Sequence, residues 1–378
     1  MNTKVVIFGL STEGYELACK IAINGGDVQI IDESTPSAIT IKTDIAKTYP
    51  SVQALKDDEP LLSMTPIDVA ISKAQYLFFA PRIRKTGQDI KTELNSKFKD
   101  AISKIKKGSS VVYCLGTGFG GNAENISLLE HVTGFKTGKN VFYFYYPLNK
   151  LYESPNFIGS FASKIDERLV NLLSLKNDTK NVAITTSEHL HAINMLKYFS
   201  NITCILEVCK IAKDKDTKSD LNSNEFNEIY LDNMVDNLFD LRSLGGSFEG
   251  ANSLMYLING SLKGVDSYIK KLIDEIRLVL KRNELKASRT RILLFWSLDP
   301  YEMKGEKHEK ISELETKLKD YIGDVESIQN HKDILQNDKT VIIVACSKAD
   351  YNSLSKQKKD NQVIIMKANP LCQICTQK

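Results

Sequence analysis

The sequence predicts an α/β protein in which two α/β units are separated by a helical stretch. Three observations lead to this prediction. Up to about residue 180, short β-branched runs alternate with amphipathic, lysine-rich segments; a region of long helical patterns follows; and the alternation resumes near Arg289. Alternation of this kind is typical of a mostly parallel sheet with crossover helices.

The N-terminal strands are predicted from runs rich in Val, Ile, Phe and Tyr that end at Gly, Pro or Asp. The five runs are KVVIFG (4–9), DVQIID (27–32), YLFFAP (76–81), SSVVYCLG (109–116) and NVFYFYYP (140–147). The stretches between them, such as Leu94 to Ile105, show helical spacing. This first unit is therefore predicted to contain a parallel sheet.

Length and charge restrict the function classes. The chain has 378 residues, so two or three domains are expected. It carries 50 Lys and Arg against 47 Asp and Glu, and the net charge of +3 gives no electrostatic case for nucleic acid or a membrane surface as a partner. No apolar run approaches the length of a spanning helix, and no secretion signal opens the sequence. We expect a cytoplasmic protein.

A long helix is predicted in the stretch TTSEHLHAINMLKYFSNITCILEVCKIAKD, which contains neither glycine nor proline. Ser187 is expected to cap its N-terminus. One stripe of the helix is apolar, and the flanks are apolar as well, at Ile193, Ile205 and Val208; the stripe consists of Met195, Phe199, Ile202, Leu206 and Cys209. A helix that is apolar nearly all round is buried in a core or against a second subunit, so we expect a homodimer.

The remaining patterns complete a central helical domain and a second α/β unit. Further helices are expected over Glu225 to Leu241, Asn252 to Ile258 and Gly264 to Leu285, with a break at Gly245 and Gly246. The last helix should bury Val265, Ile269, Leu272, Ile276, Val279 and Leu280. The C-terminal unit should contain RILLFWSL, a helix over His308 to Tyr321, a short strand near Val325, TVIIVAC and QVIIMKA. The predicted domains are residues 1–183, 184–288 and 289–378.

The start of the chain has the outline of a dinucleotide-binding unit of the Rossmann type. Gly9 follows the first strand, Gly14 lies in the start of the next helix, and Asp32 ends the second strand, where it would hold the ribose hydroxyls and favour NAD over NADP. Ser11 replaces the usual middle glycine, and its hydroxyl could donate to a phosphate. Glu13 would compete for the positive end of the helix dipole. The alternative is a Rossmann-like unit that binds nothing.

Domain order and several local motifs resemble the nucleotide-sugar dehydrogenases of the UDP-glucose/GDP-mannose dehydrogenase family. The resemblance covers essentially the whole chain. It rests on GLSTEG (9–14), on Ala80 and Pro81 ending a strand, on CLGTGFGG after the strand SSVVY, on KYFSN (197–201), on Gly245–Gly246 and on LLFWSLDP.

The resemblance implies a set of functional residues. Gly9, Leu10, Ser11, Gly14, Asp32, Pro81 and Thr117 would bind NAD. Lys197 and Asn201 would polarise and orient the reacting oxygen, and Gly245 and Gly246 would contact a nucleotide-sugar-like substrate. The lysine and asparagine are four residues apart and so share one helix face. The alternative is a snorkelling lysine beside a capping asparagine on a dimer-forming helix.

The chain also departs from the family pattern at its reactive positions. Phe248 stands at the place of the nucleophilic cysteine, Asn252 at that of the aspartate that assists water, Leu148 at that of a glutamate and Asp299 at that of a lysine. Without a thiol that captures the intermediate aldehyde, oxidation to an acid has no obvious route, whereas a single hydride transfer needs no cysteine. Two hypotheses follow: an NAD-dependent oxidoreductase that transfers one hydride, or a catalytically inactive relative that serves as a binding or assembly module.

Seven cysteines, odd in number and unevenly spaced, indicate reduced thiols. Cys372 and Cys375 could form half of a zinc site or a redox pair, but no second pair accompanies them. We therefore expect no metal.

Overall fold

The structure is a computed structural model, and it describes residues 3–58, 60–84, 89–149, 157–162, 166–176, 178–211, 229–247, 253–329, 340–356 and 363–370. The chain divides into two compact units. The first contains residues 1–193 with two short returning segments, 246–248 and 299–305; the second contains 194–245, 249–298 and 306–378. The division into three domains remains a prediction.

The first unit is built on a sheet with the strand order β4-β3-β2-β1-β5-β6-β7-β8-β9. The run from β2 to β7 is parallel, β3 and β4 extend one edge antiparallel, and β8 pairs antiparallel with β7. The strands are β1 (Lys4–Phe8), β2 (Asp27–Ile31), β3 (Ser37–Ile41), β4 (Met64–Pro66), β5 (Tyr76–Phe79), β6 (Ser110–Tyr113), β7 (Phe142–Tyr145), β8 (Phe157–Ser160) and β9 (Lys180–Ala183). All five predicted N-terminal strands are confirmed, and β3, β4, β8 and β9 were not predicted.

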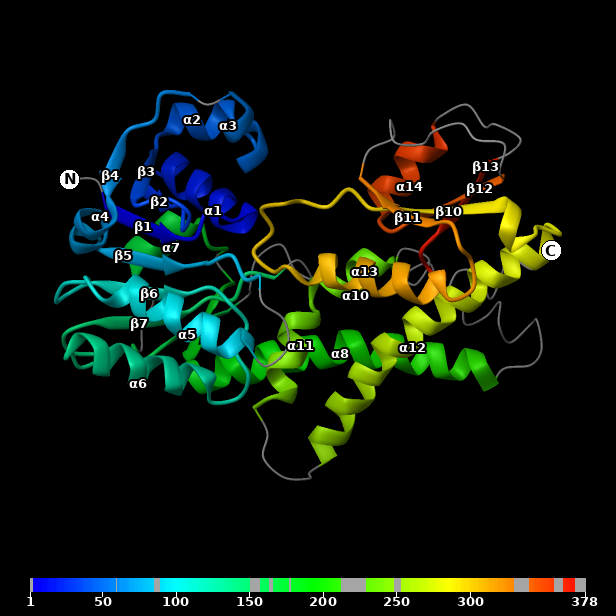
Figure 1. Cartoon of the computed structure of the whole chain (residues 1–378). Coiled ribbons are helices and arrows are strands. Elements are labelled where there is room, and N and C mark those ends of the chain that lie inside the picture. Colours follow the sequence, from blue (N-terminus) through cyan, green and yellow to red (C-terminus); the bar gives the residue numbers. More distant parts are fainter. Residues whose placement is uncertain are drawn as a thin grey trace. The chain divides into compact units, whose positions relative to one another are not determined.

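Helices flank the sheet of the first unit, and every residue of the central strands β5 and β6 is buried, as expected for parallel strands covered on both faces. Helix α1 packs with α7, and α5 packs with α6 (Figure 1). The helices are α1 (Thr12–Ile23), α2 (Thr43–Thr48), α3 (Val52–Asp58), α4 (Ile67–Lys73), α5 (Asp89–Ile102), α6 (Gly121–Thr133) and α7 (Glu167–Leu173). Because β1, β2, β5 and β6 are parallel, their carboxyl ends lie along one edge.

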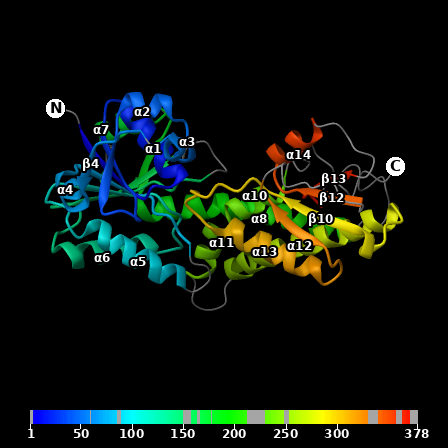
Figure 2. The same ribbon diagram turned by 45° about the horizontal axis from the view of Figure 1, so that its top comes forward.

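The second unit contains a parallel sheet of order β11-β10-β12-β13, which confirms the predicted C-terminal strands (Figure 2). Its strands are β10 (Thr290–Phe295), β11 (Val325–Ile328), β12 (Thr340–Ala345) and β13 (Val363–Lys367). Its other elements are α10 (Leu231–Asp236), α11 (Leu238–Gly245), α12 (Ser253–Arg282), the 3-10 turn η2 (Ala287–Arg289), α13 (Glu306–Lys319) and α14 (Lys348–Ser355). A cluster including Leu293, Phe295 and Ile343 forms the core between the sheet and α14.

Two predictions about the middle helices were wrong. The segment expected to be one helix up to Leu241 contains two, α10 and α11, which are separated at Asn237; residues 212–228 lie outside the described part. The helices expected on either side of residue 260 are one continuous helix, α12. The predicted buried face of α12 is confirmed except at Val279, which is half-buried.

The predicted long helix is α8 (Ile184–Ile211), whose first residues belong to the first unit and whose remainder belongs to the second. Ser187 is not its cap, because the helix begins three residues earlier and the Ser187 hydroxyl donates to the Ile184 carbonyl, 2.6 Å away. The stripe from Met195 to Leu206 is buried as predicted. The helix is not buried all round within the chain, because Ile193 is 47% exposed and Val208 is 38% exposed.

Gly264 sets how closely α12 packs against α8 within the second unit. A Cβ at Gly264 would lie 1.9 Å from the Thr203 hydroxyl oxygen on α8, so no side chain fits there. Gly260, one turn earlier, has no atom within 4 Å of such a Cβ. Gly260 and Gly264 therefore differ in role, because packing requires glycine only at Gly264.

We predict opposite effects for alanine at these two positions. Gly264→Ala should lower the free energy of unfolding by about 1–3 kcal/mol, because it overpacks the α8–α12 contact. Gly260→Ala, the matched control, should raise it by up to about 1 kcal/mol through helix propensity. Chemical denaturation measures both values, and equal effects would contradict the close packing of the two helices.

Candidate dinucleotide-binding site

The turn between β1 and α1 lies against the end of β5, and only glycine fits at its first position. Gly9 has φ +118, and a Cβ there would lie 2.2 Å from the Ala80 carbonyl oxygen and 2.6 Å from the Pro81 Cα. Gly14 is also required, because a Cβ on it would approach the Gly9 carbonyl oxygen to 2.6 Å. The two glycines hold helix and turn close to the sheet, which is the backbone geometry of a Rossmann loop.

Ser11 serves the fold of this loop. It is fully buried, its Oγ accepts a hydrogen bond from the Gly14 amide at 3.0 Å as the N-cap of α1, and the hydroxyl donates to the Ala80 carbonyl at 3.2 Å. The hydroxyl therefore has protein partners on both sides. Leu10 is buried in the core, so only its backbone could face a ligand.

Asp32 directly follows β2, and several donors hold its buried carboxylate. Its Oδ1 accepts from the Ser34 amide at 3.0 Å and the Ser34 hydroxyl at 2.6 Å, and its Oδ2 pairs with Lys56 at 2.9 Å. Burial alone raises the pKa of Asp32, but the hydrogen bonds from Ser34 and Lys56 outweigh it and leave the pKa below its usual value. The group is thus anionic at neutral pH.

A short segment, residues 299–305, lies across the start of α1, and we call it the strap. The Thr12 amide donates to the Tyr301 carbonyl at 2.8 Å, and the Thr12 hydroxyl donates to the Asp299 carboxylate. The Met303 amide donates to the Glu13 carboxylate at 2.8 Å. Glu13, expected to disturb an anion site from the sequence, instead holds the strap.

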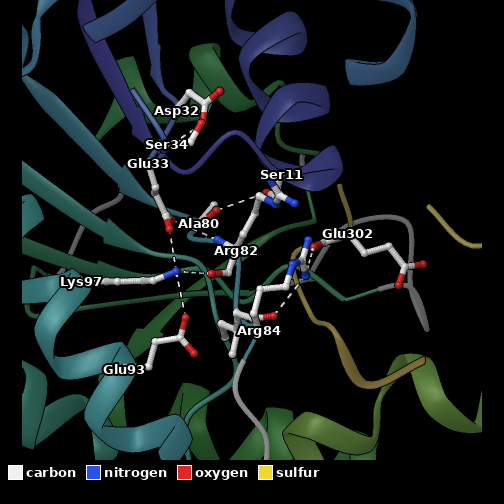
Figure 3. Close-up of polar contacts among 11 residues, drawn as sticks. Ser11, Asp32, Glu33, Ser34, Ala80, Arg82, Arg84, Glu93, Lys97 and Glu302 are labelled. Atoms are coloured by element: carbon white, nitrogen blue, oxygen red, sulfur yellow. Dashed lines mark hydrogen bonds and ion pairs between the residues drawn. The ribbon is translucent and has the colours of Figure 1, made fainter. Parts of the chain in front are cut away.

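Two arginines that follow β5 also bind the strap (Figure 3). Arg82 and Arg84 each place an Nη2 atom 2.9 Å from the Pro300 carbonyl, and Arg84 also donates to the Glu302 carbonyl at 3.0 Å. The Ile83 amide between them donates to the Met303 carbonyl at 2.7 Å. Sequence reasoning missed these two residues, and the only local signal for them is the Arg-x-Arg pattern directly after the strand end.

Lys97 fixes the side chain of Glu33, the acidic residue next to Asp32. The Lys97 ammonium pairs with Glu33 at 2.6 Å and with Glu93 at 3.0 Å, and it also donates to the Arg82 carbonyl (Figure 3). Glu33 in turn accepts from the Arg82 amide at 3.1 Å. The acidic groups at the ribose end of the candidate site are therefore already paired with lysines.

Thr117 lies in the turn after β6, where a buried polar network fixes it. Its hydroxyl oxygen accepts from the Asn122 side chain at 2.9 Å, and its amide donates to the Tyr145 hydroxyl at 3.2 Å. The Glu188 carboxylate accepts from the Asn122 amide at 2.8 Å, which occupies the N-terminus of α6. Pro81 is buried beside Gly9. Asp32, Pro81 and Thr117 follow β2, β5 and β6, whose carboxyl ends lie at one edge of the sheet.

The predicted catalytic pair lies on α8. Lys197 and Asn201 are both exposed and lie away from the buried stripe, as the sequence indicated. Gly245 ends α11, where a Cβ would make ordinary contact with Leu262 and Ile258, and Gly246 is exposed. Their roles in catalysis and substrate binding remain predictions.

The departures from the family pattern are only partly described. Phe248 and Asn252 lie outside the described residues. Leu148 is half-buried, and its amide donates a hydrogen bond to the Cys114 carbonyl. Asp299 belongs to the strap. Burial raises the pKa of the Cys114 and Cys346 thiols, so neither forms a reactive thiolate.

Within the described residues, no three His, Cys, Asp or Glu side chains are placed to hold a metal ion, and Cys372 and Cys375 fall outside that part of the chain. None of the described helices combines the length and apolarity needed to cross a bilayer.

No protein-family model and no curated protein sequence matches the chain. Solved structures do match it. The UDP-D-ManNAc dehydrogenase of Pyrococcus horikoshii aligns with a TM-score of 0.64 at 14% identity, covering 97% of this chain and 99% of that chain. The UDP-glucose dehydrogenase of Pyrobaculum islandicum aligns at 0.65 and 12%, covering 98% and 94%. The UDP-N-acetyl-mannosamine dehydrogenase of Staphylococcus aureus aligns at 0.57 and 14%, covering 98% and 100%.

We predict that the charge of Asp32 contributes to stability. Asp32→Asn should lower the free energy of unfolding by about 1–2 kcal/mol at pH 7, because the hydrogen bonds to a charged acceptor are lost. Since the pKa is lowered in the folded state, the difference from wild type should be complete well above about pH 4 and shrink as the pH falls through the folded pKa.

The matched control is Asp27→Asn, at the exposed start of the same strand. Denaturation at a series of pH values measures both variants. A deficit of Asp32→Asn that persists undiminished in acid would mean that shape rather than charge is responsible.

The chain has a nucleotide-sugar dehydrogenase fold, which it shares with these structures across nearly its whole length.

Proposed function

We propose that the chain binds NAD at the carboxyl ends of β1, β2 and β5 and acts as an oxidoreductase on a CH–OH or carbonyl group. The observation that carries the proposal is the Gly9 turn, whose left-handed backbone and contact with Ala80 exclude any side chain. In parallel α/β sheets, ligands bind outside the carboxyl ends of strands where the strand order reverses, and β1 is that strand here.

Asp32 supports the choice of dinucleotide. A carboxylate that stays charged at neutral pH accepts hydrogen bonds from a ribose diol and repels a 2′-phosphate, so NAD is favoured over NADP. Backbone groups of Gly9, Leu10 and Ser11, the helix start at Gly14, and Pro81 and Thr117 would complete the contacts. The bound cofactor would supply the hydride acceptor or donor.

The chemistry is limited to one hydride transfer. Conversion of an alcohol to a carbonyl releases a hydride and a proton and needs no covalent intermediate. Oxidation of an aldehyde to an acid in this class of enzyme needs a nucleophile, and Phe248 stands at the position where a thiol would be required. The buried thiols Cys114 and Cys346 are not available as substitutes.

We assign the substrate contacts to groups outside the loop. The Lys197 ammonium would donate to the substrate oxygen and stabilise negative charge that develops on it, while Asn201 would orient the same oxygen. Gly245 and Gly246, which have no side chains, would let the substrate approach the main chain closely. Because the similar structures are dehydrogenases of UDP-sugars, a nucleotide-linked sugar is the substrate class we propose.

A second candidate function is a catalytically inactive binding or assembly module. It is favoured by one specific contact: the Thr12 amide at the start of α1, a natural phosphate donor, is bonded to the chain's own Tyr301 carbonyl. The replacement of the reactive residues by Phe248 and Asn252 points the same way.

A nucleotide titration separates the two candidates. We expect NAD or NADH at about 100 times its dissociation constant to add about 2.7 kcal/mol to the free energy of unfolding, as measured by thermal shift. Fluorescence of Trp296 provides an independent signal. If neither nucleotide produces a response, the chain is not a dehydrogenase.

If NAD binds, Lys197→Ala should abolish hydride transfer to UDP-sugar substrates, followed by nicotinamide absorbance, and leave the NAD affinity nearly unchanged. The control is Lys263→Ala, an exposed lysine on α12. Parallel loss of NAD affinity and activity in Lys197→Ala would show that Lys197 is structural.

We also propose a homodimer through α8, because Ile193 and Val208 expose apolar surface on a helix whose other side is buried. Light scattering at micromolar concentration should give twice the chain mass, and Val208→Glu should shift it to the monomer mass. A wild-type monomer would contradict the assignment.

A further inference from the structure

The donors around the start of α1 converge on consecutive carbonyls of the strap. Thr12 contributes its backbone amide, and Arg82 and Arg84 contribute guanidinium groups. The acceptors are the backbone carbonyls of Pro300, Tyr301 and Glu302. An amide at a helix N-terminus together with two arginines is a donor set that proteins use for phosphate groups.

The strap is a poor electrostatic match for these donors. Two guanidinium cations point at the same neutral oxygen of Pro300, although such groups bind phosphate or carboxylate more strongly. The Nε atom of Arg82 is buried and has no acceptor among the described residues. The pKa of Arg84 is lowered, first by desolvation and then by the neighbouring Arg82. The site therefore favours an acceptor that carries negative charge.

We propose that Arg82, Arg84 and the Thr12 amide bind the diphosphate of a nucleotide ligand, and that the strap competes with it for these donors. The inference rests on the proposed function, in that NAD is the diphosphate considered. Tyr301 and its neighbours must leave the donors before the diphosphate can use them. The strap thereby acts as a built-in competitor of the ligand.

The strap includes Asp299, whose carboxylate would move away from α1 when the strap is displaced. The Asp299 carboxylate accepts from the Thr12 hydroxyl and from the Tyr301 amide, so it holds both the helix start and the strap. Displacement would remove this negative charge from the helix N-terminus, where it opposes a second anion. Glu13 would lose its bond to the Met303 amide and become free to turn outward.

Competition of this kind weakens the observed affinity. The apparent dissociation constant equals the intrinsic one divided by the fraction of molecules whose donors are free. A substitution that loosens the strap and keeps all three donors in the chain should therefore tighten binding. This is the opposite of what a substitution that merely damages the site would do.

Gly305 provides such a substitution. A Cβ at Gly305 would lie 2.9 Å from the Ile83 carbonyl oxygen and 3.3 Å from an Arg84 nitrogen, so alanine there pushes the strap away without changing charge. We expect Gly305→Ala to bind NAD about fivefold more tightly or better in a titration of the full-length chain. The matched control is Gly323→Ala, where a Cβ meets no atom within 4 Å.

Hydrogen exchange reports on the strap directly. The Tyr301 and Met303 amides are bonded to the carboxylates of Asp299 and Glu13, so both should be protected. Saturating NAD, or inorganic pyrophosphate as the simplest diphosphate probe, should speed exchange in a peptide covering residues 299–305. A peptide covering β12 (Thr340–Ala345) serves as the reference.

Charge removal tests the arginines themselves. The double variant Arg82→Gln/Arg84→Gln should lower NAD affinity about tenfold or more, even though it also loosens the strap. The double variant Arg282→Gln/Arg289→Gln removes the same charge at exposed positions and should leave the affinity unchanged.

The outcomes distinguish this inference from the proposed function. Equal NAD affinity in wild type, Gly305→Ala and the arginine double variant, with unchanged strap exchange, would overturn the inference and leave NAD binding intact. Absence of NAD binding in wild type and Gly305→Ala alike would overturn the proposed function. If inorganic pyrophosphate still speeds strap exchange in that case, the diphosphate site stands without NAD.

Discussion

The hydrogen bond between the Thr12 amide and the Tyr301 carbonyl occupies the backbone donor that a bound diphosphate would need. The amide belongs to the helix start that a Rossmann loop offers to phosphate, and the carbonyl belongs to a segment that returns from far along the chain. Whether the protein binds a dinucleotide depends on the free-energy difference between this bond with its neighbours and the contacts that a diphosphate would make.

The rigid and exchangeable parts of the site differ in their physical basis. Gly9 and Gly14 are fixed by atoms that leave no space for a side chain, and Ser11 is buried with partners on both sides. These features build the turn regardless of any ligand. The strap is held by hydrogen bonds and by stacking of Arg82 on the Tyr301 ring, with the guanidinium carbon 5.2 Å from the ring centre. Contacts of this type exchange readily for others of the same kind.

Much of the fold could be predicted because its central strands are continuous apolar runs. β5 and β6 are buried along their whole length, and such runs are unambiguous in sequence. The strands β4 and β8 were missed because they are short and contain proline or glycine. The break expected in α12 was wrong because helix packing at Gly264 overrides the low helix propensity of glycine.

The candidate site was predictable only in its local part. Gly9, Gly14 and Asp32 could be selected as candidates because Rossmann loops place such residues at this spacing after two strands. The strap could not, because Thr12 and Asp299 are separated by 287 positions and nothing local marks the pairing. The role of Glu13 was misjudged for the same reason: its partner, the Met303 amide, is equally distant in sequence.

The most direct measurement is a crystal structure of the chain grown with saturating NAD. We predict cofactor density whose diphosphate contacts the Thr12 amide and the guanidinium groups of Arg82 and Arg84, with residues 299–305 moved off them. A structure in which Tyr301 still accepts from Thr12 and no cofactor occupies the loop would contradict it.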